Sequence, residues 1–177
     1  SLRTYNELRE LLRKADYNTH LRFAKEICEK SDDELLTLNL KLNLTWDEIK
    51  QLSEHPLVEI GAHTLHHLSL KYLNQEESKK EIFESKKEIE EKIGQAIYHF
   101  AYPYGSLDDA SKKEYQILKA IGFQSTVYNH PAGIYSETPK YQIPRMGLSD
   151  EINDKRLKEF FSGELHFNFN GLEKIIG

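Results

Sequence analysis

Short apolar runs alternate with longer helical patterns over the second part of the chain, and this alternation constrains the fold more than any other feature. Four runs predict strands, at 57–62, 98–106, 123–129 and 141–144. Helical patterns follow the first, second and fourth of them, at 74–92, 107–121 and 150–161. Repeated strand-then-helix units favour parallel strands joined by crossover helices, so the sequence predicts an α/β sheet or barrel. The alternating segment GELHFNFNG (163–171) adds a predicted edge strand.

The first part of the chain is built differently, because all nine glycines and all five prolines lie in residues 56–177. Apolar residues recur at helical spacing over 4–15 and 19–30. The stretch 36–44 alternates apolar and polar residues, which fits either a half-buried strand or a loop laid on an apolar surface. Three Ser/Thr-x-x-Glu capping boxes mark helix starts, at Thr4, Ser31 and Thr45.

We therefore divide the chain into a mainly helical insertion or lead-in segment over 1–44 and an α/β part over 45–177. The composition agrees with one globular domain of 177 residues. Its 24 basic and 29 acidic residues give a net charge of −5, the opposite of what a phosphate-binding nucleic-acid protein needs. The net negative charge fits a neutral substrate better than a nucleic acid.

No stretch approaches the ~18 consecutive apolar residues of a membrane-spanning helix, so the sequence predicts no membrane segment. The single cysteine, Cys28, lies in a helical pattern and is predicted to be a buried, inert thiol. Neither feature determines the compartment in which the protein works.

Three histidines within five residues form the richest chemical cluster, in the segment GAHTLHH (61–67). His63 and His67 are four residues apart, so both imidazoles can face one divalent metal, whereas His66 would point elsewhere. The cluster follows a predicted buried strand, and α/β enzymes carry their active sites at the carboxyl ends of strands. Thr64 stands where a zinc metalloprotease of the HExxH type needs glutamate, which excludes that class.

A second segment, FAYPYG (100–105), ends the next predicted strand in a Pro/Gly turn. The order of buried strand, H-T-x-x-H, long helix, strand and F-A-Y-P-Y-G resembles the polysaccharide deacetylase family. These are the NodB-like metal-dependent amidohydrolases that remove N-acetyl or O-acetyl groups from sugars. LTWDEI (44–49) and IPR (143–145) are similar to two further family segments. The resemblance covers roughly residues 44–150.

The resemblance implies that His63 and His67 bind a divalent metal, expected to be zinc, with a third ligand from an aspartate. It implies that the backbone N–H of Tyr104, in a turn shaped by Pro103, faces the oxyanion that forms on the acetyl group. Thr64 would hydrogen-bond within the histidine loop to hold it, and would lie beside the substrate.

Three further residues are candidates, and the first two have an alternative beside each. Arg145 would position the substrate or orient a carboxylate, or form a structural salt bridge. Tyr102 would stack on a sugar ring, unless it packs in the core. His166, in the C-terminal strand pattern, is the candidate for the family's late histidine, a general acid.

The departures from the family pattern concern the carboxylates. Family members begin with a strand that ends in T-F-D-D and supplies the base and the third metal ligand, and no such segment is present here. Asp32-Asp33 and Asp108-Asp109 are interpreted as helix caps. Ala101 stands where many members have an arginine, and Leu68 replaces the usual proline after the second histidine.

Two explanations compete for the missing aspartates. In the first, which we favour because residue 1 is serine, the protein extends upstream and the chain lacks the first two strand-helix units. In the second, the protein is a relative that has lost its carboxylates. An incomplete barrel exposes strand edges, so we expect self-association.

The sequence thus predicts an α/β fold, an incomplete or distorted (β/α) barrel of the glycoside hydrolase/deacetylase type with an N-terminal helical insertion. The expected function is metal-dependent hydrolysis of a carbon–nitrogen, non-peptide bond in an N-acetylated glycan, with little activity in this chain alone. The alternative is an inactive glycan-binding or scaffold module on the same fold.

Overall fold

The computed structural model describes residues 2–30, 37, 41–130 and 132–145, and the positions 154, 155, 158, 162, 168, 169, 172 and 173. Its centre is a small parallel sheet in the order β1 (His99–Ala101), β2 (Ser125–Tyr128) and β3 (Ile143–Pro144). Phe100 pairs with Thr126, and Val127 pairs with Ile143. The predicted parallel α/β arrangement is confirmed, although the described strands form an open sheet and do not close a barrel.

The predicted strand at 57–62 is reduced to a single parallel bridge between Ala62 and Phe100. Ala62 donates its N–H to His99 O at 2.9 Å, and Ala101 donates to Ala62 O at 2.9 Å. This bridge places the segment before His63 along the free side of β1. Four consecutive segments of the chain therefore lie side by side with their carboxyl ends at the same edge.

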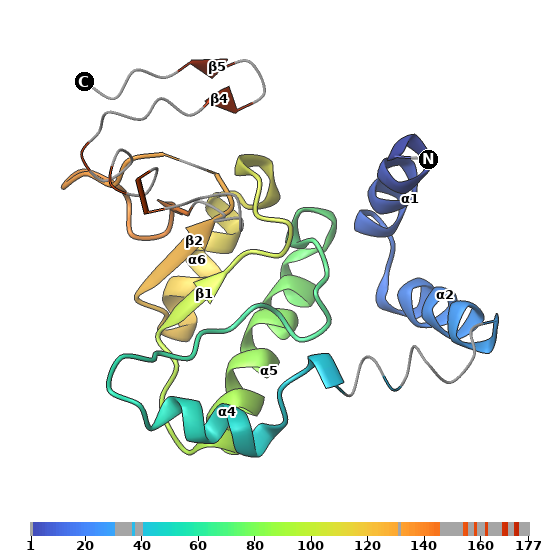
Figure 1. Ribbon diagram of the computed structural model, residues 1–177, viewed down its shortest axis with the longest axis horizontal. Coiled ribbons are helices and arrows are strands. Elements are labelled where there is room, and N and C mark those ends of the chain that lie inside the picture. Colours follow the sequence, from blue (N-terminus) through green and yellow to red (C-terminus); the bar gives the residue numbers. More distant parts are fainter. Residues whose placement is uncertain are drawn as a thin grey trace.

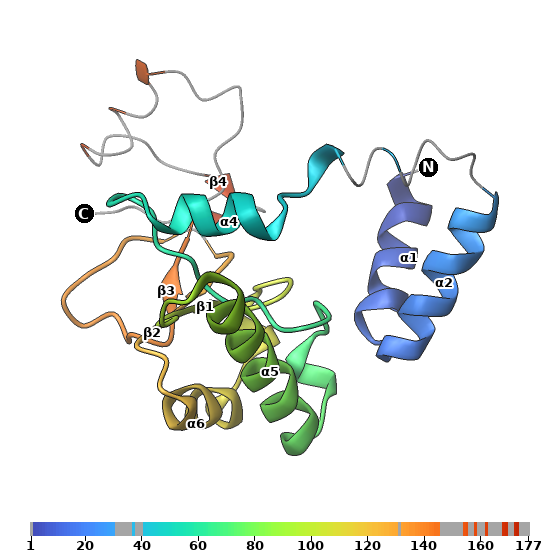
Figure 2. The ribbon, with the colours of Figure 1, turned by 90° about the horizontal axis from the view of Figure 1, so that it is seen from below.

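Two helices cover one face of this sheet, α5 (Gln75–Ile93) and α6 (Lys112–Ile121), and they pack against each other (Figures 1 and 2). Each begins with a capping box, from Asn74 to Glu77 and from Ser111 to Glu114. Each ends at a glycine with positive φ, as expected for a left-handed C-cap. The helix predicted over 107–121 is thus split, because Leu107–Asp109 forms a separate 3-10 turn, η2.

The shorter helix α4 (Trp46–Ser53) has the predicted capping box at Thr45, whose hydroxyl accepts from the N–H of Glu48. It packs on α5. A 3-10 turn, η1 (Leu70–Tyr72), connects the histidine segment to α5.

The hydrophobic core lies between the sheet and these helices. Its largest buried side chains include Tyr102, Tyr128 and Phe100. The Phe100 and Tyr102 rings meet edge to face at 5.4 Å, and the Tyr102 and Tyr128 rings lie 4.7 Å apart. Because Tyr102 is fully buried, this core reaches the strand ends that carry the candidate site.

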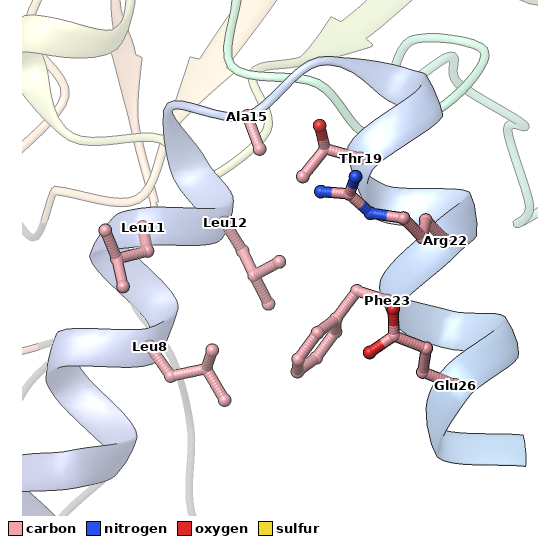
Figure 3. Close-up of a pocket in the computed structure, with 8 residues that line it drawn as sticks. All are labelled: Leu8, Leu11, Leu12, Ala15, Thr19, Arg22, Phe23 and Glu26. Atoms are coloured by element: carbon pink, nitrogen blue, oxygen red, sulfur yellow. The ribbon is translucent and has the colours of Figure 1, made fainter.

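The N-terminal helices α1 (Leu2–Arg13) and α2 (Tyr17–Lys30) lie next to each other to one side of the sheet (Figures 1 and 2). They face each other across a shallow pocket (Figure 3), lined by Leu8, Leu11, Leu12, Ala15, Thr19, Arg22, Phe23 and Glu26. The capping box predicted at Thr4 is wrong, because α1 already begins at Leu2. The predicted box at Ser31 and the predicted burial of the Cys28 thiol lie outside the described part of the chain.

The alternating stretch 36–44 was expected to be a strand or a loop, but Thr37, Lys41 and Leu42 are helical. Near the C-terminus, β4 (Asn168–Phe169) and β5 (Leu172–Glu173) pair antiparallel with each other as a separate two-stranded sheet. Where the predicted edge strand is described, at β4, it pairs with β5. No helix among the described residues is long and apolar enough to cross a membrane.

Candidate active site

The candidate site lies at the carboxyl ends of the parallel segments. His63 directly follows the Ala62 bridge, and Tyr104 lies three residues beyond the end of β1 at Ala101. Arg145 follows β3 and donates its backbone N–H to Tyr128 O at 2.9 Å. Residues up to 82 positions apart, 145 minus 63, are thereby brought to one edge of the sheet, as the strand order predicts.

The His63 imidazole is held by a backbone contact across two neighbouring segments. Its Nδ1 lies 2.7 Å from Ala101 O. A carbonyl oxygen only accepts, so Nδ1 carries the proton and Nε2 keeps its lone pair. Partial burial lowers the pKa of His63, and the nearby charge of Arg145 lowers it further. His63 is therefore a neutral imidazole with one nitrogen free to bind a metal.

His67 lies beside His63, with the two ring centroids 4.9 Å apart and the rings edge to face. Partial burial lowers the pKa of His67, and the neighbouring His63 contributes to the same shift. The His67 ring also meets the Tyr104 ring, with centroids 5.2 Å apart. The three side chains therefore form one cluster, and both histidines favour the neutral state that metal ligation requires.

Three residues of the site have left-handed backbone: Thr64 at φ 64°, His67 at φ 57° and Tyr104 at φ 62°. They are all the non-glycine residues with positive φ in the described part of the chain. Such conformations cost about 1–3 kcal/mol each and persist where the surroundings enforce them. For Thr64 the conformation is especially unfavourable, because its side chain is β-branched.

The turn that carries Tyr104 is fixed by its neighbours. Gly105 has φ +73°, and its N–H donates to Pro103 O at 2.7 Å. Asn129 donates its N–H to Gly105 O at 2.7 Å, which joins the turn to the end of β2. A Cβ on Gly105 would lie 2.8 Å from the Asn129 nitrogen, so only glycine fits this position. No backbone carbonyl of the described residues accepts from the Tyr104 N–H.

A buried aspartate, Asp109, joins the segment after His67 and the segment after Tyr104 to helix α1. Asp109 accepts from the N–H and hydroxyl of Ser106 at 2.7 and 2.6 Å and lies 3.3 Å from Ser69 Oγ. Arg13 of α1 forms an ion pair with Asp109 and donates to Ser106 Oγ at 3.0 Å. The Arg13 guanidinium also lies 5.4 Å from the centroid of the Tyr104 ring. The N-cap of η2 is Ser106, and Asp109 is the third residue of its capping box, so the predicted capping role of Asp109 is confirmed in this form.

The start of α2 contacts the histidine segment. The Tyr17 ring lies 3.7 Å from the His66 ring, centroid to centroid. His66 turns away from the other two histidines, as expected, and its Nδ1 lies 2.7 Å from Glu81 Oε1. Sequence reasoning missed Arg13, Tyr17 and Glu81 as site residues, because nothing in the local sequence around them indicates a partner so distant along the chain.

The remaining candidates are placed as follows. Tyr102 is fully buried, with its hydroxyl 3.2 Å from Thr126 Oγ1, so it packs in the core and has no ring face for a sugar. Thr64 lies in the histidine loop, and its Oγ1 is buried without a hydrogen-bond partner, contrary to the expected stabilising bond. Arg145 is exposed and close enough to His63 to affect its pKa. His166 lies outside the described residues.

Two imidazoles that could bind a metal thus lie side by side, those of His63 and His67. Among the described residues, no group of three or more His, Cys, Asp or Glu side chains is arranged to hold a metal ion. The two histidines fit the nitrogen side of a zinc or similar site, and no carboxylate of the described part of the chain completes it.

A model of the polysaccharide deacetylase family matches residues 3–125. The chain belongs to this family. In this family member, the match includes the N-terminal helices, the histidine segment and the turn that carries Tyr104. No curated protein matches the chain in sequence.

Solved deacetylase structures have a similar fold. The Streptococcus pyogenes deacetylase PplD, in complex with acetate, has a TM-score of 0.61 at 18% identity, over 66% of this chain and 50% of PplD. A polysaccharide deacetylase from Bacillus cereus has a TM-score of 0.57 at 19% identity, over 66% of this chain and 36% of its own. The BpsB deacetylase domain of Bordetella bronchiseptica has a TM-score of 0.52 at 18% identity, over 58% and 48%. The chain therefore spans about half or less of the length of these structures.

Proposed function

We propose that the chain forms part of a metal-dependent deacetylase that hydrolyses the carbon–nitrogen bond of an N-acetylated sugar. One observation carries this proposal. His63, His67 and Tyr104 meet at the carboxyl ends of neighbouring parallel segments, with the ring centroids 4.9 and 5.2 Å apart. A metal-binding histidine pair beside a turn with a free backbone donor suits the hydrolysis of an acyl group.

Each residue has a role in this chemistry. His63 and His67 would hold the metal through neutral imidazoles, and the Ala101 carbonyl fixes the orientation of the His63 ring. A divalent ion such as zinc, when bound, polarises the acetyl carbonyl and lowers the pKa of a water molecule. The Tyr104 N–H would donate to the oxygen that becomes negatively charged, and Pro103 and Gly105 keep that donor in place.

The exposed guanidinium of Arg145 is proposed to attract a carboxylate or to orient the sugar near His63. Thr64 is proposed to line the substrate side of the loop. The third metal ligand and the general base are proposed to come from outside the described residues, and His166 remains a candidate acid. The parallel segments would form one part of a (β/α) barrel, since the chain spans about half the length of PplD.

The second candidate is a glycan-binding or scaffold module without turnover. The observation that favours it is the lack of a carboxylate beside His63 and His67 among the described residues. Both candidates place the glycan at the same strand ends, so substrate binding alone does not separate them.

Acetate release from N-acetylglucosamine oligomers separates the two candidates. The chain with added zinc should release acetate slowly, and either a chelator or His63→Asn should abolish the release. His55→Asn is the matched control, because His55 follows the end of α4 and its Nδ1 accepts from the Leu57 N–H rather than from a residue of the candidate site. Oligomer binding with no acetate release above that of His63→Asn would favour the binding module.

A further inference from the structure

Glu81 is a buried carboxylate in the middle of α5, with 7% of its surface exposed. It faces the histidine loop, which we define as residues 63–67. Its Oε2 accepts from the backbone N–H of Leu65 at 3.1 Å and from that of His66 at 2.9 Å. Its Oε1 lies 2.7 Å from His66 Nδ1, which donates because an ionised carboxylate only accepts. One side chain of α5 thus makes three polar contacts with two consecutive loop residues.

The residues on both sides of these contacts have strained backbone. Thr64 at φ 64° precedes Leu65, and His67 at φ 57° follows His66. Consecutive N–H groups beside left-handed residues form a concave site for an anion. In this loop the anion is supplied by the protein itself, as the Glu81 carboxylate. Charge-assisted hydrogen bonds of this type are stronger than neutral ones, so they can hold a conformation that the loop would otherwise leave.

The loop receives further support through His66. The ring of Tyr17 lies 3.7 Å from the His66 ring, and the backbone carbonyl of Glu81 accepts from Leu65 N–H at 3.1 Å. His66 therefore does not share the surroundings of His63 and His67. It connects the loop to Glu81, whereas His63 and His67 lie side by side at the strand ends.

We propose that Glu81 is a positioning residue that holds the histidine loop in its left-handed conformation and so sets His63 and His67 side by side. The inference rests on the proposed function only in the claim that the two imidazoles bind a metal. The conformational part stands by itself, because it concerns hydrogen bonds within the chain.

Amide hydrogen exchange tests the conformational part without any metal. In chelator-treated protein, the His66 amide should exchange at least about tenfold faster in Glu81→Leu, which removes both carboxylate oxygens and fills a similar volume. The Leu65 amide should accelerate less, because the backbone carbonyl of residue 81 still accepts from it. Glu81→Gln, which keeps one acceptor, should give a smaller acceleration. Glu88→Leu is the matched control, since Glu88 is exposed on the same helix, and it should leave both amides unchanged.

Zinc affinity, measured by calorimetry, tests the consequence for the two imidazoles. Replacing a residue that orients metal ligands costs about 10–100-fold in affinity, so Glu81→Leu should weaken zinc binding by at least tenfold. Adding Thr64→Gly should recover part of that loss, because glycine adopts positive φ without strain. If Glu81 acts by fixing the backbone, Thr64→Gly should recover zinc affinity. If Glu81 merely adds negative charge near the metal, Thr64→Gly should recover none.

The outcomes separate the inference from the proposed function. Unchanged exchange at Leu65 and His66 in Glu81→Leu would overturn the inference. Equal loss of zinc affinity in Glu81→Leu and Glu88→Leu, or no recovery by Thr64→Gly, would also overturn it, because the effect would then be one of charge. If the wild-type chain binds no zinc, the proposed function fails, and the exchange rates still decide whether Glu81 holds the loop.

Discussion

The Nδ1 of His63 donates a hydrogen bond to the backbone carbonyl of Ala101 over 2.7 Å. This contact joins the histidine loop to the end of β1, where the Tyr104 turn begins. It selects one tautomer and leaves Nε2 as an acceptor. Two segments 38 residues apart in the sequence are thereby fixed relative to each other by the residue on which the proposed chemistry depends.

Arg13→Ala should release the N-terminal helices from the site. The substitution leaves the buried Asp109 carboxylate without its cationic partner and removes the guanidinium from the Tyr104 ring. We expect a loss of about 3 kcal/mol in the free energy of unfolding in urea. Protease cleavage between α1 and α2 should become faster.

Arg3→Ala is the control for this prediction. Arg3 pairs with Glu7 on the exposed side of α1, so its removal should change stability by less than about 1 kcal/mol. Equal effects of the two alanine variants would show that the Arg13 ion pair does not fix α1 to the rest of the protein.

Gly105→Ala should disturb the Tyr104 turn more than its positive φ alone explains. A Cβ at Gly105 would lie 2.8 Å from Asn129 N, whereas a Cβ at Gly94, also at positive φ, would meet nothing within 4 Å. Gly94→Ala should cost about 1–2 kcal/mol for its left-handed backbone. Gly105→Ala should cost at least about 1 kcal/mol more because of the close contact.

Thermal or urea unfolding of the two glycine variants gives this comparison directly. The same stability loss in both would contradict the tight packing of the turn against the end of β2. A zinc titration of Gly105→Ala should still show binding, since neither histidine lies in that turn.

The stability of the metal-free chain should fall as the pH decreases below about 6.5. The pKa values of His63 and His67 are lowered from 6.5 in the folded state, chiefly by burial. The unfolded chain therefore binds more protons than the folded chain between the lowered pKa values and 6.5, and stability rises with pH across that interval. Urea midpoints at pH 5 and pH 7.5 measure the effect.

Replacing His63 and His67 by asparagine should reduce this pH dependence of stability. The part of the pH dependence that comes from other titratable groups should remain. An unchanged slope in the double variant would show that the two imidazoles do not stay neutral in the folded protein.

The chain should associate with itself at high concentration. Among the described residues, no strand pairs with the sheet beyond the Ala62 segment or beyond β3, and Leu57, five residues before Ala62, is 88% exposed. Unpaired edges next to apolar side chains favour pairing with another chain. Sedimentation velocity should show dimers or larger species whose fraction increases with concentration. A monomer at every concentration would contradict this expectation.

Local sequence signals predicted much of the fold. The capping box at Thr45, the strand at 98–106 and the long helix now seen as α5 have direct local causes, and each is present. The expected strand at 57–62 shortened to one bridge, because a strand needs a partner on at least one side and only Ala62 meets β1. Edge pairing of this kind depends on the rest of the sheet and is not contained in the local pattern.

Of the candidate site, the sequence indicated only the two histidines and the turn that carries Tyr104. Histidines four residues apart after a strand and a Pro/Gly turn after the next strand are visible in the sequence, and the structure brings them together. Glu81 and Arg13 were not predictable, since each acts through residues 15 to 96 positions away. For Tyr102, sugar stacking and core packing were both left open by the sequence, and the structure shows the ring fully buried in the core.

Calorimetric titration of zinc into the wild-type chain and into the variant with both His63→Asn and His67→Asn tests the central claim most directly. We predict one zinc site per chain in the wild type, with an affinity that falls as the pH is lowered from 7.5 to 5.5, and no binding in the double variant. Equal zinc affinity in the two proteins would contradict the assignment of these histidines as the metal ligands of the site.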